Sequence, residues 1–450
     1  MKEYARGVMT RETVRLLGLL ARLISFKSIT PNSAGCIEYI AGLLASHNFR
    51  VIIQESHRIP KTTNLYAFCP LSVITSYQQK LGYIDWRDWH EQEEGGRDFE
   101  DTKWWEFKSS SNMESGDLSE LNPSYFNLCF AGHVDVVPAG DAALWPADPF
   151  ELYQEDGILY GRGMVDMKGA IAAAICAVFR VLDLLRDGSL DDAHGLRDLM
   201  ISFLFTSDEE GTGEYGLRKM LSLISHLGYT IDLAVLGEPA SKNDIGDLVK
   251  IGRRGSANFD LIIYGMQGHV AYPELCVNPN AILVKFLNAL VVSKLDEGCE
   301  LFQPSNLEIT SIDCNNHLTN VIPSSARVRF NIRFNTLHTH QSLKSYIEDE
   351  LLRLAPGIRY DLTCSSNHFA FVQDMGLELM QKILAIVQKK TRASFSTSGG
   401  VSDACYISAY CPVVEIGLKH GSAHKPAECV SLKDLEELVE IYSNIILQIH

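Results

Sequence analysis

The sequence predicts an α/β protein with a mainly parallel sheet and a smaller α+β domain inserted into it. Short apolar strands alternate with helical stretches over much of the 450-residue chain, which is typical of a parallel sheet covered by helices. Polar residues directly follow several of these strands. One internal stretch has a different order of elements, and the length of the chain also favours two domains.

The first half of the chain supplies most of the expected sheet. Thr10 can cap a helix that runs to about Phe26, because a threonine hydroxyl at the N-cap accepts a free backbone N–H. The expected apolar face of this helix holds Val14, Leu17, Leu20 and Ile24. Further apolar runs predict strands at residues 51–54, 64–68, 127–131, 200–205 and 232–236, and a helix at 169–185.

Residues 71–125 differ from the rest of the chain in charge and aromatic content. They hold twelve acidic and five basic residues, a net charge of −7. They also hold four of the five tryptophans, which are Trp86, Trp89, Trp104 and Trp105. The charge favours exposure to solvent, whereas the tryptophans favour docking on a surface. We therefore expect an acidic insertion in a surface loop, without a metal ligand.

Residues 255–365 have another pattern. Apolar and polar residues alternate at 257–264 and 326–334, while 280–292 and 342–354 have helical periodicity. The order strand–helix–strand–strand–helix–strand is that of a ferredoxin-like domain. The sequence therefore predicts a larger domain from residues 1–254 and 366–450, with the smaller domain inserted between them.

Composition limits the classes of partner. The net charge of −16 argues against nucleic acid or an anionic membrane and fits a protein that handles small molecules. The eleven cysteines contain no CxxC pair, and their number is odd. We therefore expect reduced thiols and a cytoplasmic location. We expect neither a secretory signal after Met1 nor a membrane span, which needs ~18 apolar residues.

Five short segments carry side chains that bind metals, and several directly follow a predicted strand. In open α/β sheets, ligands bind at the carboxyl ends of the strands. The segments supply two imidazoles and three carboxylates, a mixed set that suits zinc, with cobalt or manganese as substitutes. These candidate ligands are His133, Asp166, Glu210, Glu238 and His424.

Two zinc ions would balance the charge of this set. They carry +4, the carboxylates carry −3 and a bridging hydroxide carries −1, so no net charge is buried. With Asp166 between the metals, each metal keeps one histidine and one further carboxylate. Asp135 follows His133 by two residues on the same face of an extended segment. It can accept the second N–H of that imidazole, although a local turn role is the alternative.

Glu209 is an acid beside the candidate ligand Glu210. Neighbouring side chains point in different directions, so Glu209 is free to act as a general base toward a water whose pKa a metal has lowered. The absence of a GxSxG segment disfavours a serine hydrolase. A non-catalytic metal-binding scaffold is the alternative of another class, and loss of Glu209 or of a ligand would favour it.

The five segments, in this order, resemble the dinuclear metallopeptidase superfamily that includes aminoacylase, acetylornithine deacetylase and glutamate carboxypeptidase. Further segments resemble its succinyl-diaminopimelate desuccinylase family: Gly252–Ser256, Gly268–Pro273, Thr319–Pro323 and Ser396–Asp403. The likeness covers nearly the whole chain except 71–125. It implies a zinc-peptidase catalytic domain and an inserted dimerisation or lid domain. The implied reaction is hydrolysis of N-succinyl-L,L-2,6-diaminopimelate to succinate and diaminopimelate, in lysine and cell-wall precursor synthesis.

The resemblance also implies a role for each residue at the metals. The implied ligands of one zinc are His133, Asp166 and Glu238, and those of the other are Asp166, Glu210 and His424. Cobalt is an alternative in the second site. Glu209 would be the base. A cis peptide bond is implied between Asp166 and Met167.

The remaining implied roles concern a homodimer and a multiply anionic substrate. His269 and Asn320 would reach the active site of the partner subunit, where His269 helps to hold the oxyanion. Arginine suits carboxylates because its fork binds both oxygens. The residues implied to bind substrate are Arg253, Tyr272, Arg333, Ser398, Gly399 and Gly400, together with Asn320.

One position departs from the family pattern. The family often has asparagine four residues before the last ligand, where this chain has His420. The same chemistry on acetylornithine or a dipeptide is a second reading of the function. The arginines and the Ser-Gly-Gly segment disfavour it.

Overall fold

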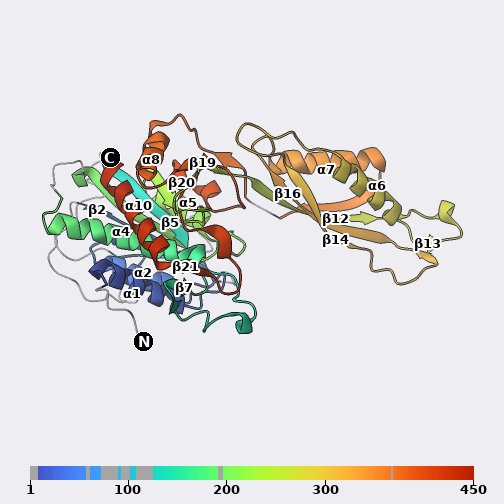
Figure 1. Cartoon of the computed structure of the whole chain (residues 1–450). Coiled ribbons are helices and arrows are strands. Elements are labelled where there is room, and N and C mark those ends of the chain that lie inside the picture. The colour runs from blue at the N-terminus through green and yellow to red at the C-terminus, as the bar shows by residue number, and fades with distance from the viewer. Residues whose placement is uncertain are drawn as a thin grey trace. The chain divides into compact units, whose positions relative to one another are not determined.

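The computed structural model describes residues 9–56, 61–71, 90–92, 102–107, 125–190, 196–365 and 368–449. The chain forms two compact units (Figure 1). Unit 1 consists of Met1–Ile251, Gln373–Phe395 and Tyr406–His450, and unit 2 of Gly252–Val372 and Ser396–Cys405. Unit 2 thus takes in the expected insertion at 255–365 and also a second segment, which carries Ser398, Gly399 and Gly400.

Unit 1 is built on a mixed sheet of ten strands within the described residues, in the order β19-β10-β20-β9-β5-β8-β2-β1-β4-β3. The four central strands, β20, β9, β5 and β8, pair in parallel, as predicted. Beyond β8, the strands β2, β1, β4 and β3 each pair antiparallel with the strand before them in this order. On the other side, β10 pairs antiparallel with β20. The bounds are β1 Arg50–Ser56, β2 Thr63–Pro70, β3 His90–Gln92, β4 Thr102–Phe107, β5 Phe126–His133, β8 Leu199–Thr206, β9 Leu233–Leu236, β10 Leu248–Lys250, β19 Ser394–Ser396 and β20 Val413–Glu415.

Helices cover this sheet. One hydrophobic cluster joins alternate strand residues to α1, α2, α4, α8 and α10, and α5 contacts β2 and β8 outside that cluster. The helices α4 and α10 lie side by side (Figure 1). No helix in the described ranges is both long and apolar enough to cross a membrane. The helix bounds are α1 Arg11–Ser25, α2 Cys36–Ala45, α4 Gly169–Arg186, α5 Leu217–His226, α8 Glu378–Gln388, α9 Ala404–Ile407 and α10 Leu432–Gln448.

Helix α1 begins as expected, and most of its expected apolar face is buried: Leu20 and Ile24 are fully buried, and Leu17 packs against the core. The Thr10 side chain accepts a hydrogen bond from Thr13 N at 3.1 Å, which confirms the predicted cap. Val14, however, is 57% exposed, whereas Leu16 and Leu23 are buried. The helix has leucines on more than one face, so its periodicity permits two apolar stripes. Contact with α4 selects the stripe that excludes Val14.

The expectation of a surface loop at 71–125 is wrong for part of that segment. Thr102–Phe107 forms β4, which pairs with β1 inside the main sheet. Trp104 is buried, and Trp105 packs against the hydrophobic core. Both tryptophans therefore dock on their own sheet. Trp86 and Trp89 lie outside the described residues.

Unit 2 has the predicted ferredoxin-like order of elements. Its antiparallel sheet runs β14-β16-β12-β17, so β14 and β17 form the edges. The helices α6 and α7 pack on this sheet through buried leucines and phenylalanines. The bounds are β12 Gly255–Tyr264, α6 Pro279–Val292, β14 Asn306–Asp313, β16 Ser325–Phe334, α7 His340–Leu354 and β17 Arg359–Cys364.

Three small sheets also lie among the described residues. In unit 2, β11 (Gly252–Arg253) pairs with β18 (Phe371–Val372), and β13 (Gly268–His269) pairs with β15 (Val321–Ile322). In unit 1, β7 (Ile158–Tyr160) lies between β6 (Tyr153–Glu155) and β21 (Cys429–Ser431). All eleven cysteines are free thiols, as predicted.

Candidate metal centre

The parallel strands bring three candidate residues to one edge of the sheet. His133 is the last residue of β5 and lies opposite Thr206, the last residue of β8. Glu210 follows β8 after a short turn, and Glu238 follows β9, the other neighbour of β5. The carboxyl ends of adjacent parallel strands meet at the same edge. These side chains therefore converge although they are far apart in the sequence.

Two loops bring the other candidate ligands. Asp166 lies in the tight turn Met164–Lys168 that leads into α4, preceded by Gly163 with φ 82°. The peptide bond between Asp166 and Met167 is cis, which confirms the expectation from the family resemblance. His424 lies in the loop between β20 and β21.

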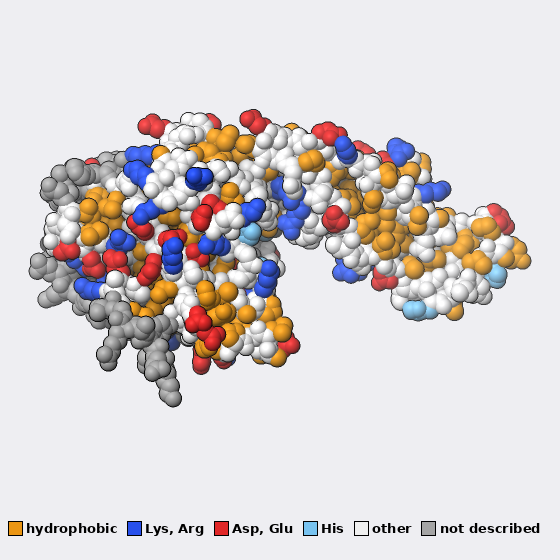
Figure 2. Space-filling view, viewed as in Figure 1, with side chains coloured by type: hydrophobic (Ala, Val, Ile, Leu, Met, Phe, Trp, Pro, Cys, Tyr) orange, Lys and Arg blue, Asp and Glu red, His pale blue; other side chains and the backbone are white. Residues whose placement is uncertain are grey.

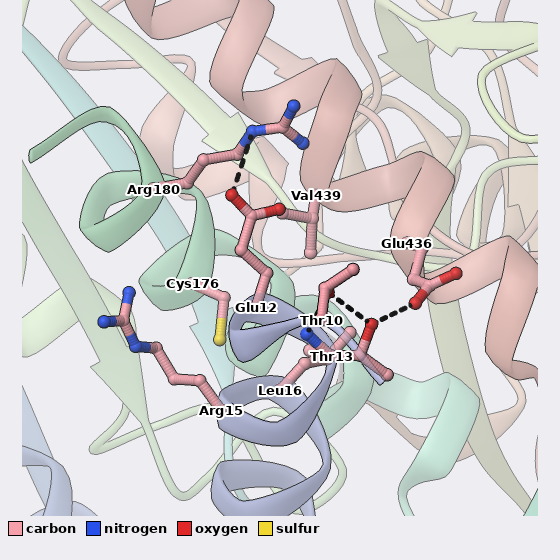
Figure 3. A pocket seen from close by; sticks show the side chains of 9 residues that line it. All are labelled: Thr10, Glu12, Thr13, Arg15, Leu16, Cys176, Arg180, Glu436 and Val439. Atoms are coloured by element: carbon pink, nitrogen blue, oxygen red, sulfur yellow. Dashed lines mark hydrogen bonds and ion pairs between the residues drawn. The ribbon is translucent and has the colours of Figure 1, made fainter. Parts of the chain in front are cut away.

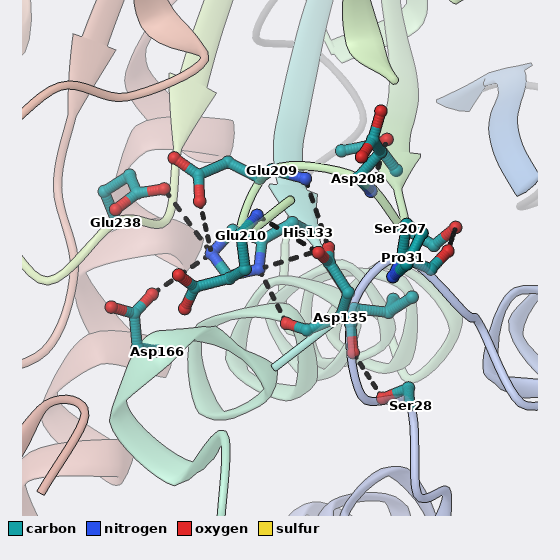
Figure 4. A network of polar contacts seen from close by, with 12 residues as sticks. Ser28, Pro31, His133, Asp135, Asp166, Ser207, Asp208, Glu209, Glu210 and Glu238 are labelled. Carbon is teal, nitrogen blue, oxygen red and sulfur yellow. Dashed lines mark hydrogen bonds and ion pairs between the residues drawn. The ribbon is translucent and has the colours of Figure 1, made fainter. Parts of the chain in front are cut away.

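The distances divide the five candidate ligands into two groups. Figure 4 shows the group around His133, with Asp166 and Glu238 beside its ring. His133 Nε2 lies 3.1 Å from Asp166 Oδ1 and 3.6 Å from Glu238 Oε1. His424 Nε2 lies 3.2 Å from Asp166 Oδ2 and 2.7 Å from Glu210 Oε1. These are the two sets that the resemblance implies. The two oxygens of Asp166 face different imidazoles, so this one carboxylate could bridge two cations.

The electrostatics of the cluster fit a bound cation. Burial opposes a charge on His133, but the hydrogen bond with Asp166 and the charges of Glu209 and Glu238 outweigh it and raise the pKa of His133 well above its usual value. Hydrogen bonds with Asp166 and Glu210 raise the pKa of His424 to about 10. The acids thus draw protons onto both imidazoles. A metal could replace these protons, since its ligands must be deprotonated.

Asp135 contacts the cluster through a different atom from the one expected. His133 Nδ1 donates to the backbone carbonyl of Asp135 at 2.9 Å, whereas the Asp135 carboxylate is 3.6 Å away. That carboxylate instead accepts the backbone N–H of Glu210 at 3.1 Å and that of Glu209 at 3.4 Å. The backbone bond leaves Nε2 of His133 for a metal. The Asp135 side chain fixes the turn that carries both glutamates.

Glu209 lies beside the candidate ligands. Its Oε2 is 3.9 Å from His133 Nε2, and its side chain is mostly buried. It also belongs to a third compact group of metal-type side chains, with His133 and Glu210. The geometry therefore permits Glu209 either as a base beside the metals or as a ligand.

The expected substrate residues lie in unit 2 and form two groups. The first group lies at the start of β12. Arg253 Nη1 donates to the Gly400 carbonyl at 3.3 Å, and Arg333 of β16 lies opposite Ser256 of β12 in the strand register. Arg333 Nη1 is buried without a hydrogen-bond partner among the described residues. Burial lowers the pKa of the Arg333 guanidinium, and so does the nearby charge of Arg254. An anion would satisfy this group.

The second group lies beyond the other end of β12. His269, in β13, pairs with Val321, next to Asn320, and its ring lies 5.8 Å from that of Tyr272. His269, Tyr272 and Asn320 are all exposed. The ten residues of β12 separate the two groups by roughly 30 Å, since a strand rises about 3.3 Å per residue.

A separate cavity of about 220 Å³ lies among α1, α4 and α10 in unit 1 (Figure 3). Its charged side chains already have partners, including Arg15, which pairs with Asp183 at 2.9 Å. Arg180 pairs with Glu12 at 3.6 Å, and Thr13 donates to Glu436 at 2.6 Å. No candidate metal ligand lines this cavity, and we assign it no ligand.

Comparison with known proteins identifies the family. The sequence model of peptidase family M20/M25/M40 matches residues 129–448, more than half of the chain. The chain belongs to peptidase family M20/M25/M40. The matched region begins after the 71–125 segment and includes all five candidate ligands and Glu209.

Curated relatives of this M20/M25/M40 chain include bacterial succinyl-diaminopimelate desuccinylases. The chain is 40% identical over 430 residues to the one from Orientia tsutsugamushi (strain Ikeda), and the match covers 95% of both chains. It is 40% identical over 438 residues to the one from Rickettsia prowazekii (strain Madrid E), covering 96% of this chain and 98% of the relative. These matches confirm the family resemblance drawn from the motifs.

Several solved structures share the fold. Aminopeptidase PepT from Bacillus cereus matches with a TM-score of 0.68 at 16% identity, over 97% of this chain and 98% of that one. The YXEP protein of Bacillus subtilis, described as a dinuclear metal binding peptidase, matches with a TM-score of 0.63 at 12% identity, over 97% of both chains. At such identities the likeness shows the fold alone, and it confirms the predicted fold class.

Proposed function

We propose that this M20/M25/M40 protein hydrolyses the succinyl amide of N-succinyl-L,L-2,6-diaminopimelate, giving succinate and L,L-2,6-diaminopimelate in the cytoplasm. The observation that carries the proposal is the pair of imidazole–carboxylate groups that share Asp166, with Glu209 beside them. The names of relatives at 40% identity over 95% of both chains support the choice of substrate. The role of the reaction in lysine and cell-wall precursor synthesis follows from its product.

The cluster would hold two zinc ions, with cobalt as an alternative in the second site. Mixed histidine and carboxylate sets suit these metals. When bound, the metals polarise the scissile carbonyl and lower the pKa of the attacking water. Glu209 takes the proton of that water and passes it to the leaving nitrogen. His269 donates a hydrogen bond to the carbonyl oxygen as negative charge develops there.

The arginines of unit 2 give the protein a means to hold an anionic substrate despite its net charge of −16. Distant charges are screened beyond about 10 Å, whereas a buried guanidinium acts at short range. The Ser398–Gly400 loop lies beside Arg253 and offers backbone groups to the same carboxylates.

Replacing Arg333 with glutamine should therefore weaken substrate binding. A hydrogen bond to a charged group contributes about 1.5–3 kcal/mol, so kcat/KM should fall by roughly tenfold to a hundredfold, mainly through KM. Arg327→Gln is the matched control, because Arg327 lies in the same strand but pairs with Asp260 on the surface. Steady-state kinetics on both variants test this role, and an unchanged KM in Arg333→Gln would refute it.

A homodimer through unit 2 completes the proposal. Figure 2 shows hydrophobic side chains gathered over unit 2. Val284, Val291 and Val292 of α6 are 67%, 63% and 71% exposed, and Ile312 of the edge strand β14 is 62% exposed. An open strand edge beside exposed apolar side chains suits pairing with a second copy. A small substrate cannot touch both ends of β12 at once, so a second copy would supply one of the two groups.

Assays with three amide substrates test the function directly. The metal-loaded protein should release succinate from N-succinyl-L,L-2,6-diaminopimelate and show far lower kcat/KM on N-acetylornithine and on a dipeptide. A chelator-treated sample serves as the control for metal dependence. Higher kcat/KM on acetylornithine would shift the proposal to that substrate. No turnover of any amide by a metal-loaded dimer would favour a metal-binding scaffold.

A further inference from the structure

A buried ion pair contacts the turn that carries Asp166. Glu428 and Arg162 are 0% and 1% exposed, and Arg162 Nη1 donates to Glu428 Oε2 at 2.6 Å. The pair lies outside the metal cluster, since none of the candidate metal-binding groups among the described residues includes Glu428.

Both oxygens of the Glu428 carboxylate bind the turn itself. Oε2 also accepts the backbone N–H of Gly163 at 3.0 Å. Oε1 accepts the backbone N–H of Val165 at 2.6 Å and that of Asp166 at 3.0 Å. One carboxylate thus accepts three backbone N–H groups of the turn Gly163–Asp166, and the last of them belongs to the candidate bridging ligand.

Glu428 also links this turn to the loop of another candidate ligand, His424. Glu428 follows His424 by four residues, and its own carbonyl accepts the N–H of Gly161 at 3.1 Å. The next residue begins β21, which pairs with β7 just before the turn. Hydrogen bonds of Glu428 and the β7–β21 pairing therefore hold the turn of Asp166 next to the loop of His424, and none of these bonds involves a metal.

We infer that Glu428 is a positioning residue that sets the Asp166 carboxylate between the two metal positions and fixes its distance from His424. This inference rests on the proposed function for the roles of Asp166 and His424. Groups that orient metal ligands typically contribute tenfold to a hundredfold in metal affinity. A purely structural ion pair would affect the stability of the fold but not the affinity of the folded protein for zinc.

Glu428→Gln is the first test, because it keeps the size of the side chain. The amide keeps one acceptor oxygen but places a donor against Gly163 N–H and the Arg162 guanidinium. The apo-protein is titrated with zinc in competition with a chromogenic chelator, and its melting temperature is measured without metal. Zinc affinity should fall tenfold to a hundredfold. At saturating zinc, kcat should fall while KM stays within about threefold.

Asp296→Asn is the matched control. Asp296 is a mostly buried carboxylate in unit 2 that also contacts four partners, namely Gly298 N, Ser305 N, Asn335 Nδ2 and His338 Nε2. None of these partners is a candidate ligand. This variant should lose melting temperature and keep its zinc affinity.

Removing one partner of a buried ion pair leaves an uncompensated charge and can prevent folding. The double variant Glu428→Gln with Arg162→Gln carries no such charge and is the second test. Weakened zinc binding in either folded variant, with Asp296→Asn unchanged, supports the inference. Wild-type zinc affinity in a folded Glu428 variant, or an equal loss in Asp296→Asn, overturns it. The titration uses no substrate, so its outcome is independent of whether the protein is a desuccinylase.

Discussion

Replacing Glu209 with glutamine is expected to abolish turnover of the succinyl substrate while both metals stay bound. Removing a general base typically lowers the rate ~10²–10⁴-fold. Glutamine keeps the size of the side chain and cannot accept the proton. Glu209 Oε2 lies 3.9 Å from His133 Nε2, so the side chain stands beside the two ligand groups without being needed in either. Steady-state kinetics and elemental analysis of the purified variant measure the two quantities.

The geometry makes this test decisive, because Glu209 also falls into a compact group with His133 and Glu210. If it were a ligand, glutamine would remove metal as well as activity. Glu210→Gln provides that reference, since it should lose metal. Glu214→Gln is the neutral control, because Glu214 is exposed in the same loop and should keep both activity and metal. Loss of metal from Glu209→Gln to the level of Glu210→Gln would reassign Glu209 as a ligand.

Local patterns predicted the elements well where one physical signal dominates. The apolar runs of β5, β8 and β9 and the alternation in β12 and β16 each have a single reading, and the structure has those strands. Two signals competed elsewhere. In β4, the surrounding acids concealed a short strand whose Trp104 is buried against the sheet. In α1, leucines on more than one face left the extent of the buried face to tertiary packing, which excludes Val14 but keeps Leu20 and Ile24.

Candidate ligands could be found because metal chemistry restricts residue types and parallel strands bring their ends together. The groups that support them lack such a signal. Glu428 is a single acid without a spacing motif, and the fold brings it to Asp166 N from 262 residues away. The acceptor of the His133 Nδ1 proton is a backbone carbonyl, which every residue possesses. Neither contact leaves a pattern in the sequence, so neither periodicity nor motif spacing can reveal it.

His269 is expected to act on the metal centre of the partner subunit, and subunit mixing tests this. Ala271 N–H donates to His269 Nδ1 at 3.0 Å, so the neutral ring carries its proton on Nε2, ready to donate. Removing one donor to a developing oxyanion costs about 10²–10³ in kcat. His269→Ala should therefore be nearly inactive as a homodimer. His317→Ala, at an exposed histidine in the loop before Asn320, should keep its activity.

Mixing inactive Glu209→Ala chains with inactive His269→Ala chains should restore activity. In a heterodimer, the intact Glu209 of one chain meets the intact His269 of the other, so one of the two sites is complete. With random exchange, half of the dimers are heterodimers, and activity should approach about one quarter of wild type. The reciprocal mixture, wild type with a chain carrying both substitutions, should also retain about one quarter, because only wild-type homodimers have complete sites. If His269 acted within its own chain, the first mixture would stay inactive and the second would retain about half. Either result, with exchange verified by a tag on one chain, would overturn the assignment of His269 to the partner's site.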